Sequence, residues 1–190
     1  MNKIDILYHN YKQVCARPWK ARVSGAERVW FAVYDKEDER RIRRAIDRFE
    51  EATLSLGYHW KRIDLTDAFA DWLTAESRRD FAEGYFRNPS LLSEAALNEF
   101  RSSLVASLIA EFHEIPANER ERTVAALTGV ASLYGFARIS DIVPKIEDSV
   151  PGRLLIFFPG SRDKQNYRLL DARDGWNYHA LPITCDKGSI

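Results

Sequence analysis

The stretch "LLIFFP" at residues 154–159 is the most informative signal for the fold in this sequence. Its apolar residues run up to a proline without alternating with polar ones. Runs of this kind are typical of strands that are covered on both faces, as in parallel sheets. The stretch therefore predicts a strand covered on both faces, and we expect Phe157 to be buried in the central sheet.

Further strands and helices alternate upstream of this stretch. Residues 28–34, "RVWFAVY", and 58–65, "YHWKRIDL", are predicted strands, and 122–136 is predicted to be a buried strand that runs into a loop. Apolar residues at helical spacing predict four helices. The first lies at the N-terminus and ends before Pro18, and the second lies between Asp35 and Gly57. The third covers 67–79 with Thr66 as its cap, and the fourth covers 88–115 and begins at Asn88-Pro89. Residues 138–146, "RISDIVPKI", predict a short helix or turn that is broken at Pro144.

The end of the chain predicts an antiparallel addition to the sheet. "NYRLLD" (166–171) and "WNYHALPI" (176–183) resemble two strands joined around Asp174-Gly175, a strong hairpin signal. Pro182 places the last strand at an edge or ends it. The expected fold is a three-layer α/β sandwich, Rossmann-like or P-loop-like, with a mostly parallel central sheet and a C-terminal antiparallel hairpin. The length of 190 residues fits one domain over 1–190.

Charge and cysteine content limit the functional classes. Lys plus Arg and Asp plus Glu are equal at 28 each, which argues against bulk electrostatic binding to nucleic acid but leaves room for a local basic patch. Cys15 and Cys185 are too few for a disulfide framework. No signal peptide or membrane span is apparent, so we expect a reduced, cytoplasmic protein.

Sequence motifs for common chemistries are missing. "GVASLYG" (129–135) follows a predicted strand, but Phe136 and Ala137 stand where a phosphate-binding loop needs Lys and a hydroxyl. The two glycines therefore predict a strand-to-loop turn. His9, His59, His113 and His179 have no metal-ligand spacing, and GxSxG is absent. We expect no metal, no cofactor and no recognisable catalytic set.

Three groups of polar residues remain as candidates. Asp64, Asp67 and Asp71 follow the second strand and could be catalytic or could serve only in capping. Helix 36–51 carries an arginine face that consists of Arg40, Arg41, Arg44 and Arg48. This face could bind nucleic acid, or its positive charge could be balanced by Glu37 and Glu39 through ion pairs at i,i+4. The segment after "LLIFFP" leaves the carboxyl end of the central strand, where α/β sheets present ligand-binding loops. It offers an interface set of Arg162, Lys164, Arg173 and Trp176, unless it is only a solvated connection.

Five segments, in order, resemble the BrxB family of BREX bacteriophage-exclusion systems. They are "VWFAVYDKEDERRIRR", "IDLTDAFADW", "YGFARISDIV", "GRLLIFFPG" and "NYRLLDARDGWNYHALPI", which together span residues 28–183. The resemblance implies a cytoplasmic bacterial defence protein, encoded beside a PglZ-type protein of alkaline-phosphatase fold, a BrxC-type ATPase and an adenine methyltransferase. It implies no catalytic residues.

Three functions stay open from the sequence. The first is an interaction module that docks the PglZ-type protein, with the BrxC-type ATPase and the methyltransferase as further possible partners. The second is a degenerate nucleotide-binding or nuclease-like enzyme that uses Asp64 and its neighbours. The third is a nucleic-acid-binding module that uses the arginine face of helix 36–51.

Overall fold

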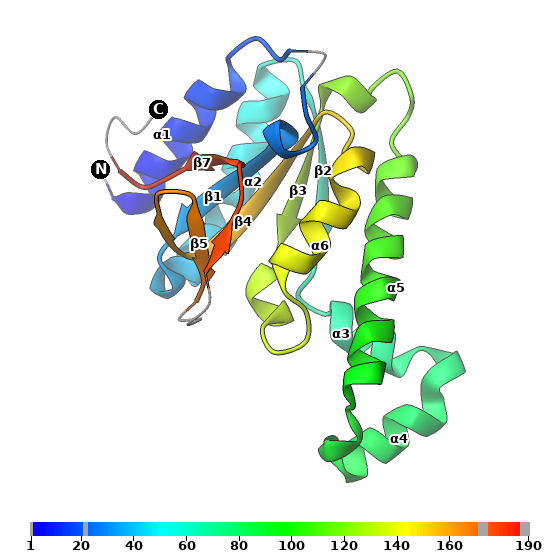
Figure 1. Ribbon diagram of the computed structural model, residues 1–190. Helices are drawn as coiled ribbons and strands as arrows, with labels where there is room; N and C mark the ends of the chain where they lie inside the picture. The colour runs from blue at the N-terminus through cyan, green and yellow to red at the C-terminus, as the bar shows by residue number, and fades with distance from the viewer. Residues whose placement is uncertain (1, 21–22, 171–174, 187–190) are drawn as a thin grey trace.

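The computed structural model describes residues 2–20, 23–170 and 175–186, and helices and strands alternate along most of this chain (Figure 1). The α-helices are α1 (Lys3–Cys15), α2 (Glu39–Ser55), α3 (Ala68–Thr74), α4 (Arg79–Arg87), α5 (Glu94–His113) and α6 (Ile139–Ile146). The strands are β1 (Val29–Tyr34), β2 (His59–Asp64), β3 (Thr123–Thr128), β4 (Arg153–Asp163), β5 (Asn166–Leu169), β6 (Trp176–Asn177) and β7 (Leu181–Ile183). The fold is α/β with one mixed sheet.

Strand β4, which contains the run "LLIFFP", lies at the centre of this sheet. The order is β2-β3-β4-β1-β7, and β4 pairs in parallel with both β3 and β1. Residues 154–158 are at most 2% exposed. Both faces of β4 are covered by helices, which explains why its sequence shows no polar alternation.

Two hydrophobic cores lie on opposite faces of the sheet because side chains alternate along each strand. On one face, Trp30 and Phe157 pack with residues of α1 and α2. On the other face, Phe31 and Phe158 belong to a core that includes residues of α3, α5 and α6. Figure 1 shows α1 and α2 on one side of the strands and α5 and α6 on the other. The predicted layering of helices on both faces is confirmed.

The strand order corrects one part of the predicted fold. A Rossmann sheet places its first strand beside its second. Here β1 lies between β4 and β7, and β2 lies at the far edge. The predicted arrangement, Rossmann-like or P-loop-like, is therefore confirmed only in part: the order differs from that of a Rossmann sheet, but the strands along the path β2-β3-β4-β1-β7 pair in parallel.

The predicted C-terminal hairpin is confirmed only in part. β5 and β6 pair antiparallel, but β5 also pairs antiparallel with the outer half of β4. The segment 176–183 is not one strand, because it divides into β6 and β7, and β7 pairs in parallel with β1. Pro182 lies in β7 at the edge of the sheet, where its missing N–H is tolerated. Asp174 lies outside the described residues.

Two local predictions also need correction. Helix α6 is not broken at Pro144 but continues to Ile146, because Ile142, Val143 and Ile146 are buried while Pro144 is exposed. Thr66 does not cap α3. Its hydroxyl donates to Asp64 instead, at 2.7 Å, and no side chain caps that helix.

Helix α5 starts later than the sequence suggests. Asn88 caps a short 3-10 turn at Pro89–Leu91, and Ser93 then caps α5 through the backbone N–H of Ala96. Across the described residues, none of the helices combines the length and the apolar character that crossing a membrane would require.

Candidate functional site

Beyond the buried part of β4, its outer half pairs antiparallel with β5, and β5 pairs antiparallel with β6. These three paired strands are called the hairpin below. The side chains of β4 are buried as far as Pro159, and those of Ser161 to Lys164 are exposed. Lys164, at the turn into β5, has a left-handed φ of 55°. The register places Arg162 opposite Tyr167 and Tyr167 opposite Trp176. These three residues therefore lie side by side across β4, β5 and β6.

Aromatic packing fixes the position of this hairpin. Tyr167 is 2% exposed, with its ring centroid 4.7 Å from that of Phe31 in β1, and its hydroxyl donates to the Ala180 carbonyl at 3.3 Å. Burial raises the pKa of Tyr167, so its hydroxyl stays neutral. Trp176 stacks on Tyr178 at 4.4 Å. The exposed tip of the hairpin thus stands on a rigid base.

The guanidinium of Arg162 lies 6.0 Å from the centroid of the Tyr167 ring. This cation–π contact restricts the long side chain, so that less conformational entropy is lost when Arg162 meets a partner. Lys164 is exposed beside it at the turn. The structure therefore brings three of the four predicted interface residues, Arg162, Lys164 and Trp176, to one hairpin. Arg173 lies outside the described residues.

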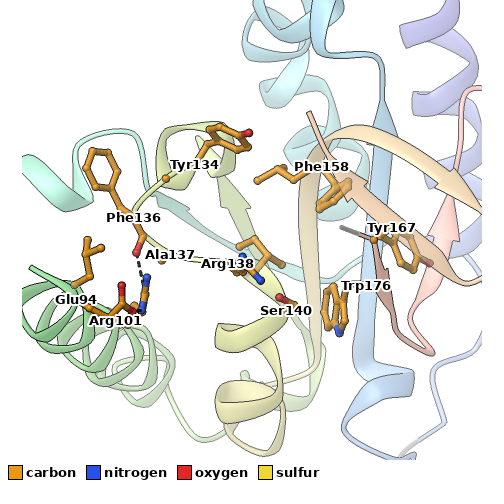
Figure 2. A pocket seen from close by; sticks show the side chains of 15 residues that line it. Glu94, Arg101, Tyr134, Phe136, Ala137, Arg138, Ser140, Phe158, Tyr167 and Trp176 are labelled. Carbon is orange, nitrogen blue, oxygen red and sulfur yellow. Dashed lines mark hydrogen bonds and ion pairs between the residues drawn. The ribbon is translucent and has the colours of Figure 1, made fainter. Parts of the chain in front are cut away.

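A pocket of about 630 Å³ opens beside this hairpin. Figure 2 shows its walls, which come from the start of α5, from the loop between β3 and α6, and from the hairpin. Its aromatic side chains are Tyr134, Phe136, Phe158, Tyr167 and Trp176. Its volume lies in the range of small-molecule pockets, and it also suits one or two side chains of a bound protein segment.

Two arginines line the pocket, and of these Arg101 pairs with a described carboxylate whereas Arg138 does not. Arg101 donates to the Phe136 carbonyl at 2.9 Å and to the side chains of Glu94 and Asn98, so its charge is matched (Figure 2). Arg138 precedes α6, is exposed, and makes no ion pair with a described residue. The pocket therefore presents one cation that pairs with no described carboxylate, in addition to the two exposed cations at the hairpin tip.

Sequence reasoning missed Arg138 and Tyr134. The signal available was Gly135, which has a φ of +87° and lies between Tyr134 and Phe136. A glycine with positive φ reverses the chain there, and Tyr134 remains 55% exposed. The sequence alone does not show that this loop faces Trp176, because the two segments are about 40 residues apart.

The arginine face of α2 is partly matched by acidic residues. Arg41 pairs with Asp38 at 2.6 Å rather than with Glu37, and Arg48 pairs with Asp5 at 3.0 Å. The i,i+4 spacing predicts that Glu39 pairs with Arg43, and this pair is present at 2.9 Å. Arg40 and Arg44 are exposed, and neither forms an ion pair with any part of the chain that the structure describes.

The carboxylates after β2 lie in different surroundings. Asp64 accepts hydrogen bonds from the backbone N–H of Thr66 at 3.0 Å and from its hydroxyl. Partial burial opposes ionisation, but these hydrogen bonds and nearby Arg62 hold the pKa of Asp64 below its usual value. Asp67 and Asp71 are exposed at the start of α3, and no hydrogen bond among the described side chains joins them to Asp64.

Gly129 ends β3 with a φ of +71°, as expected of a glycine at a strand-to-loop turn. A Cβ at this position would lie 2.4 Å from the Thr66 hydroxyl and 2.6 Å from the Thr66 backbone nitrogen. The space above Gly129 is therefore filled by the loop after β2.

Gly129→Ala is expected to lower the free energy of unfolding by about 2 kcal/mol, because the left-handed backbone and the close approach of Thr66 both disfavour a side chain. Urea denaturation followed by circular dichroism measures this change. Gly135→Ala is the matched control, since its φ is also positive but nothing lies within 4 Å of an added Cβ. An equal loss in both variants would show that backbone strain alone matters and that Thr66 does not.

Comparisons with known proteins point to one family. A family model described as BREX protein BrxB matches residues 61–183 of the chain. Searches of curated proteins and of solved structures gave no match. The matched range includes α5, the loop of Tyr134 and strands β4 to β7, and thus all three strands of the hairpin. It also includes the pocket between them.

Proposed function

The chain belongs to the BrxB family of BREX proteins, and from this premise we propose that it is a non-enzymatic adaptor that docks a PglZ-type partner. The docking surface would be the tip of the β4–β6 hairpin together with the adjacent pocket. The BrxC-type ATPase and the methyltransferase would join the same cytoplasmic assembly through this or other surfaces. The assembly would act in defence against bacteriophage.

One observation carries the proposal: Arg162 and Trp176 flank the buried Tyr167 across three paired strands that line a pocket. Arginine and tryptophan are among the residues that contribute most to binding at protein interfaces. A partner side chain that enters the pocket would bury apolar area against Phe158 and Trp176. Contacts between the partner and the hairpin tip would then exclude water from the side chain buried in the pocket.

Charge suggests which partner surface fits. Among the residues of the hairpin that the structure describes, the exposed cations are Arg162, Lys164 and Arg168, and the exposed carboxylate is that of Asp163. Arg138 adds a cation at the pocket. An acidic patch on the PglZ-type protein would complement this surface, and such complementarity speeds association and selects the partner.

Affinity purification from cells that carry the whole defence operon tests the adaptor role. We expect the tagged chain to recover the PglZ-type protein in a stable ratio, and the same pair to form from the two purified proteins. A matched preparation from cells that lack the gene for the PglZ-type protein is the control. Recovery of the other components without the PglZ-type protein, in cells that contain it, would contradict the proposal.

A further inference from the structure

A second cavity lies at the opposite end of the sheet from the hairpin. Its volume is about 360 Å³, and it is lined by the end of α1, the segment before β1, the first residue of β4 and the start of β7. Its walls include Val14, Trp30 and Leu181, and its cations are Arg17, Lys20 and Arg153. It shares no lining residue with the larger pocket.

Arg153 is the notable residue in this cavity because it is a buried cation that is only 8% exposed. Its guanidinium carbon lies 5.0 Å from the ring of Trp19 and 5.9 Å from that of Trp30. Trp19 is itself held in place, since it stacks on Tyr58 at 3.9 Å and its indole N–H donates to the Cys15 carbonyl. The orientation of Arg153 is therefore set before any ligand arrives.

No carboxylate of the described residues pairs with Arg153. Two of the five N–H donors of a guanidinium are used, by the carbonyls of Gly152 at 2.8 Å and Lys20 at 3.4 Å. Glu27 lines the same cavity, but its carboxylate accepts hydrogen bonds from Ser24. Burial, and then the nearby charge of Arg28, lower the pKa of Arg153, and the charge of Glu27 offsets this lowering only in part. A buried cation without a matching anion is costly, and a bound anion would offset that cost.

We propose that this cavity binds the phosphate group of a small phosphate-bearing molecule. The fork of Arg153 would hold two phosphate oxygens, a geometry that guanidinium groups favour. Arg17 and Lys20 are exposed at the rim and would complete the charge balance. The site is separate from the proposed docking surface and does not depend on the adaptor role.

Two features favour phosphate over a simple carboxylate. Among the described lining residues, the cations Arg17, Lys20 and Arg153 face one carboxylate, that of Glu27, so a dianion balances this charge where a simple carboxylate would leave an excess. The cavity is also larger than a phosphate ion needs, and Trp30, Leu181 and Pro182 provide apolar wall for an organic part. A phosphate ester and free phosphate share this recognition chemistry, and their relative affinities distinguish them.

Isothermal titration calorimetry with inorganic phosphate and with adenosine 5′-monophosphate tests the proposal, in buffers matched for ionic strength with potassium chloride. We expect binding of at least one of the two, with a rise in melting temperature that chloride does not produce. Tighter binding of the nucleotide assigns the site to an organic phosphate, and equal or weaker binding assigns it to free phosphate. No heat of binding from either would overturn the proposal.

Two variants locate the binding. Lys20→Ala, at an exposed rim position, is expected to weaken binding about tenfold without a change in melting temperature, whereas Arg79→Ala on α4 removes the same charge and leaves binding unchanged. Arg153→Met is expected to abolish binding while the unliganded protein keeps or gains stability, since an unmatched buried charge is removed. Full binding by a folded Arg153→Met variant would contradict the proposal. If Arg153→Met fails to fold, unchanged binding by Lys20→Ala contradicts it instead.

Discussion

Phe157→Ala is expected to lower the free energy of unfolding by about 3–5 kcal/mol. Phe157 is 1% exposed at the middle of β4, the central strand of the parallel path, and its ring meets that of Phe49 in α2 edge-on at 5.1 Å. Removing the ring leaves a cavity between the sheet and α2. Neighbouring residues can fill this cavity only partly, because backbone pairing with the adjacent strands holds β4 in place. A loss of this size is a large share of the stability of most proteins.

Urea denaturation monitored by circular dichroism measures the effect. Phe86→Ala is the matched control, because Phe86 is 67% exposed and its removal is expected to change the stability by less than about 0.5 kcal/mol. Equal stability of the Phe157 variant and the parent would mean that β4 is not a buried central strand. The layered architecture would then have to be abandoned.

The sequence predicts the framework of the fold well where the signal is local. "LLIFFP" indicates a strand that is covered on both faces. Gly57, with a φ of +79°, ends helix α2. Such features depend on hydrophobic pattern and backbone chemistry within a few residues. For the same reason β1, β2 and β3 lie where the sequence predicts them.

Strand β7 and helix α6 depend on contacts that are distant in sequence. The three residues of β7 become a strand by pairing with β1, some 150 positions away, so their own sequence suggested only the continuation of a hairpin. Pro144 stays inside α6 because three apolar neighbours are buried against the sheet, which outweighs the loss of one backbone hydrogen bond. Local propensity cannot anticipate either outcome.

The candidate sites show the same limit. Arg162, Lys164 and Trp176 could be selected from the sequence because they follow a central strand. Arg138 and Tyr134 join them only through the packing of α6 beside the hairpin. Arg153 opens a strand and looks like an ordinary surface arginine in the sequence. Its burial between Trp19 and Trp30 follows from the way the segment before β1 folds back over β4.

The second large effect concerns partner binding. Reversing both charges at the hairpin tip, with Arg162→Glu and Lys164→Glu, is expected to weaken the proposed complex with the PglZ-type protein by about 10- to 100-fold, because like charges would then face the acidic patch that we propose on that partner. Both residues are exposed, so the free energy of unfolding should change by less than about 1 kcal/mol. The matched control is Arg40→Glu with Arg44→Glu on α2, which makes the same change in net charge on a surface that the adaptor account does not use.

Docking at the hairpin tip is tested by the dissociation constant of the purified complex, measured for the parent and for both double variants by surface plasmon resonance. We expect weaker binding for the hairpin variant and unchanged binding for the α2 variant, with circular dichroism spectra of both variants that match that of the parent. Parent-like affinity in a folded hairpin variant, with a loss of affinity in the α2 variant, would contradict the account and move the interface to the arginine face of α2.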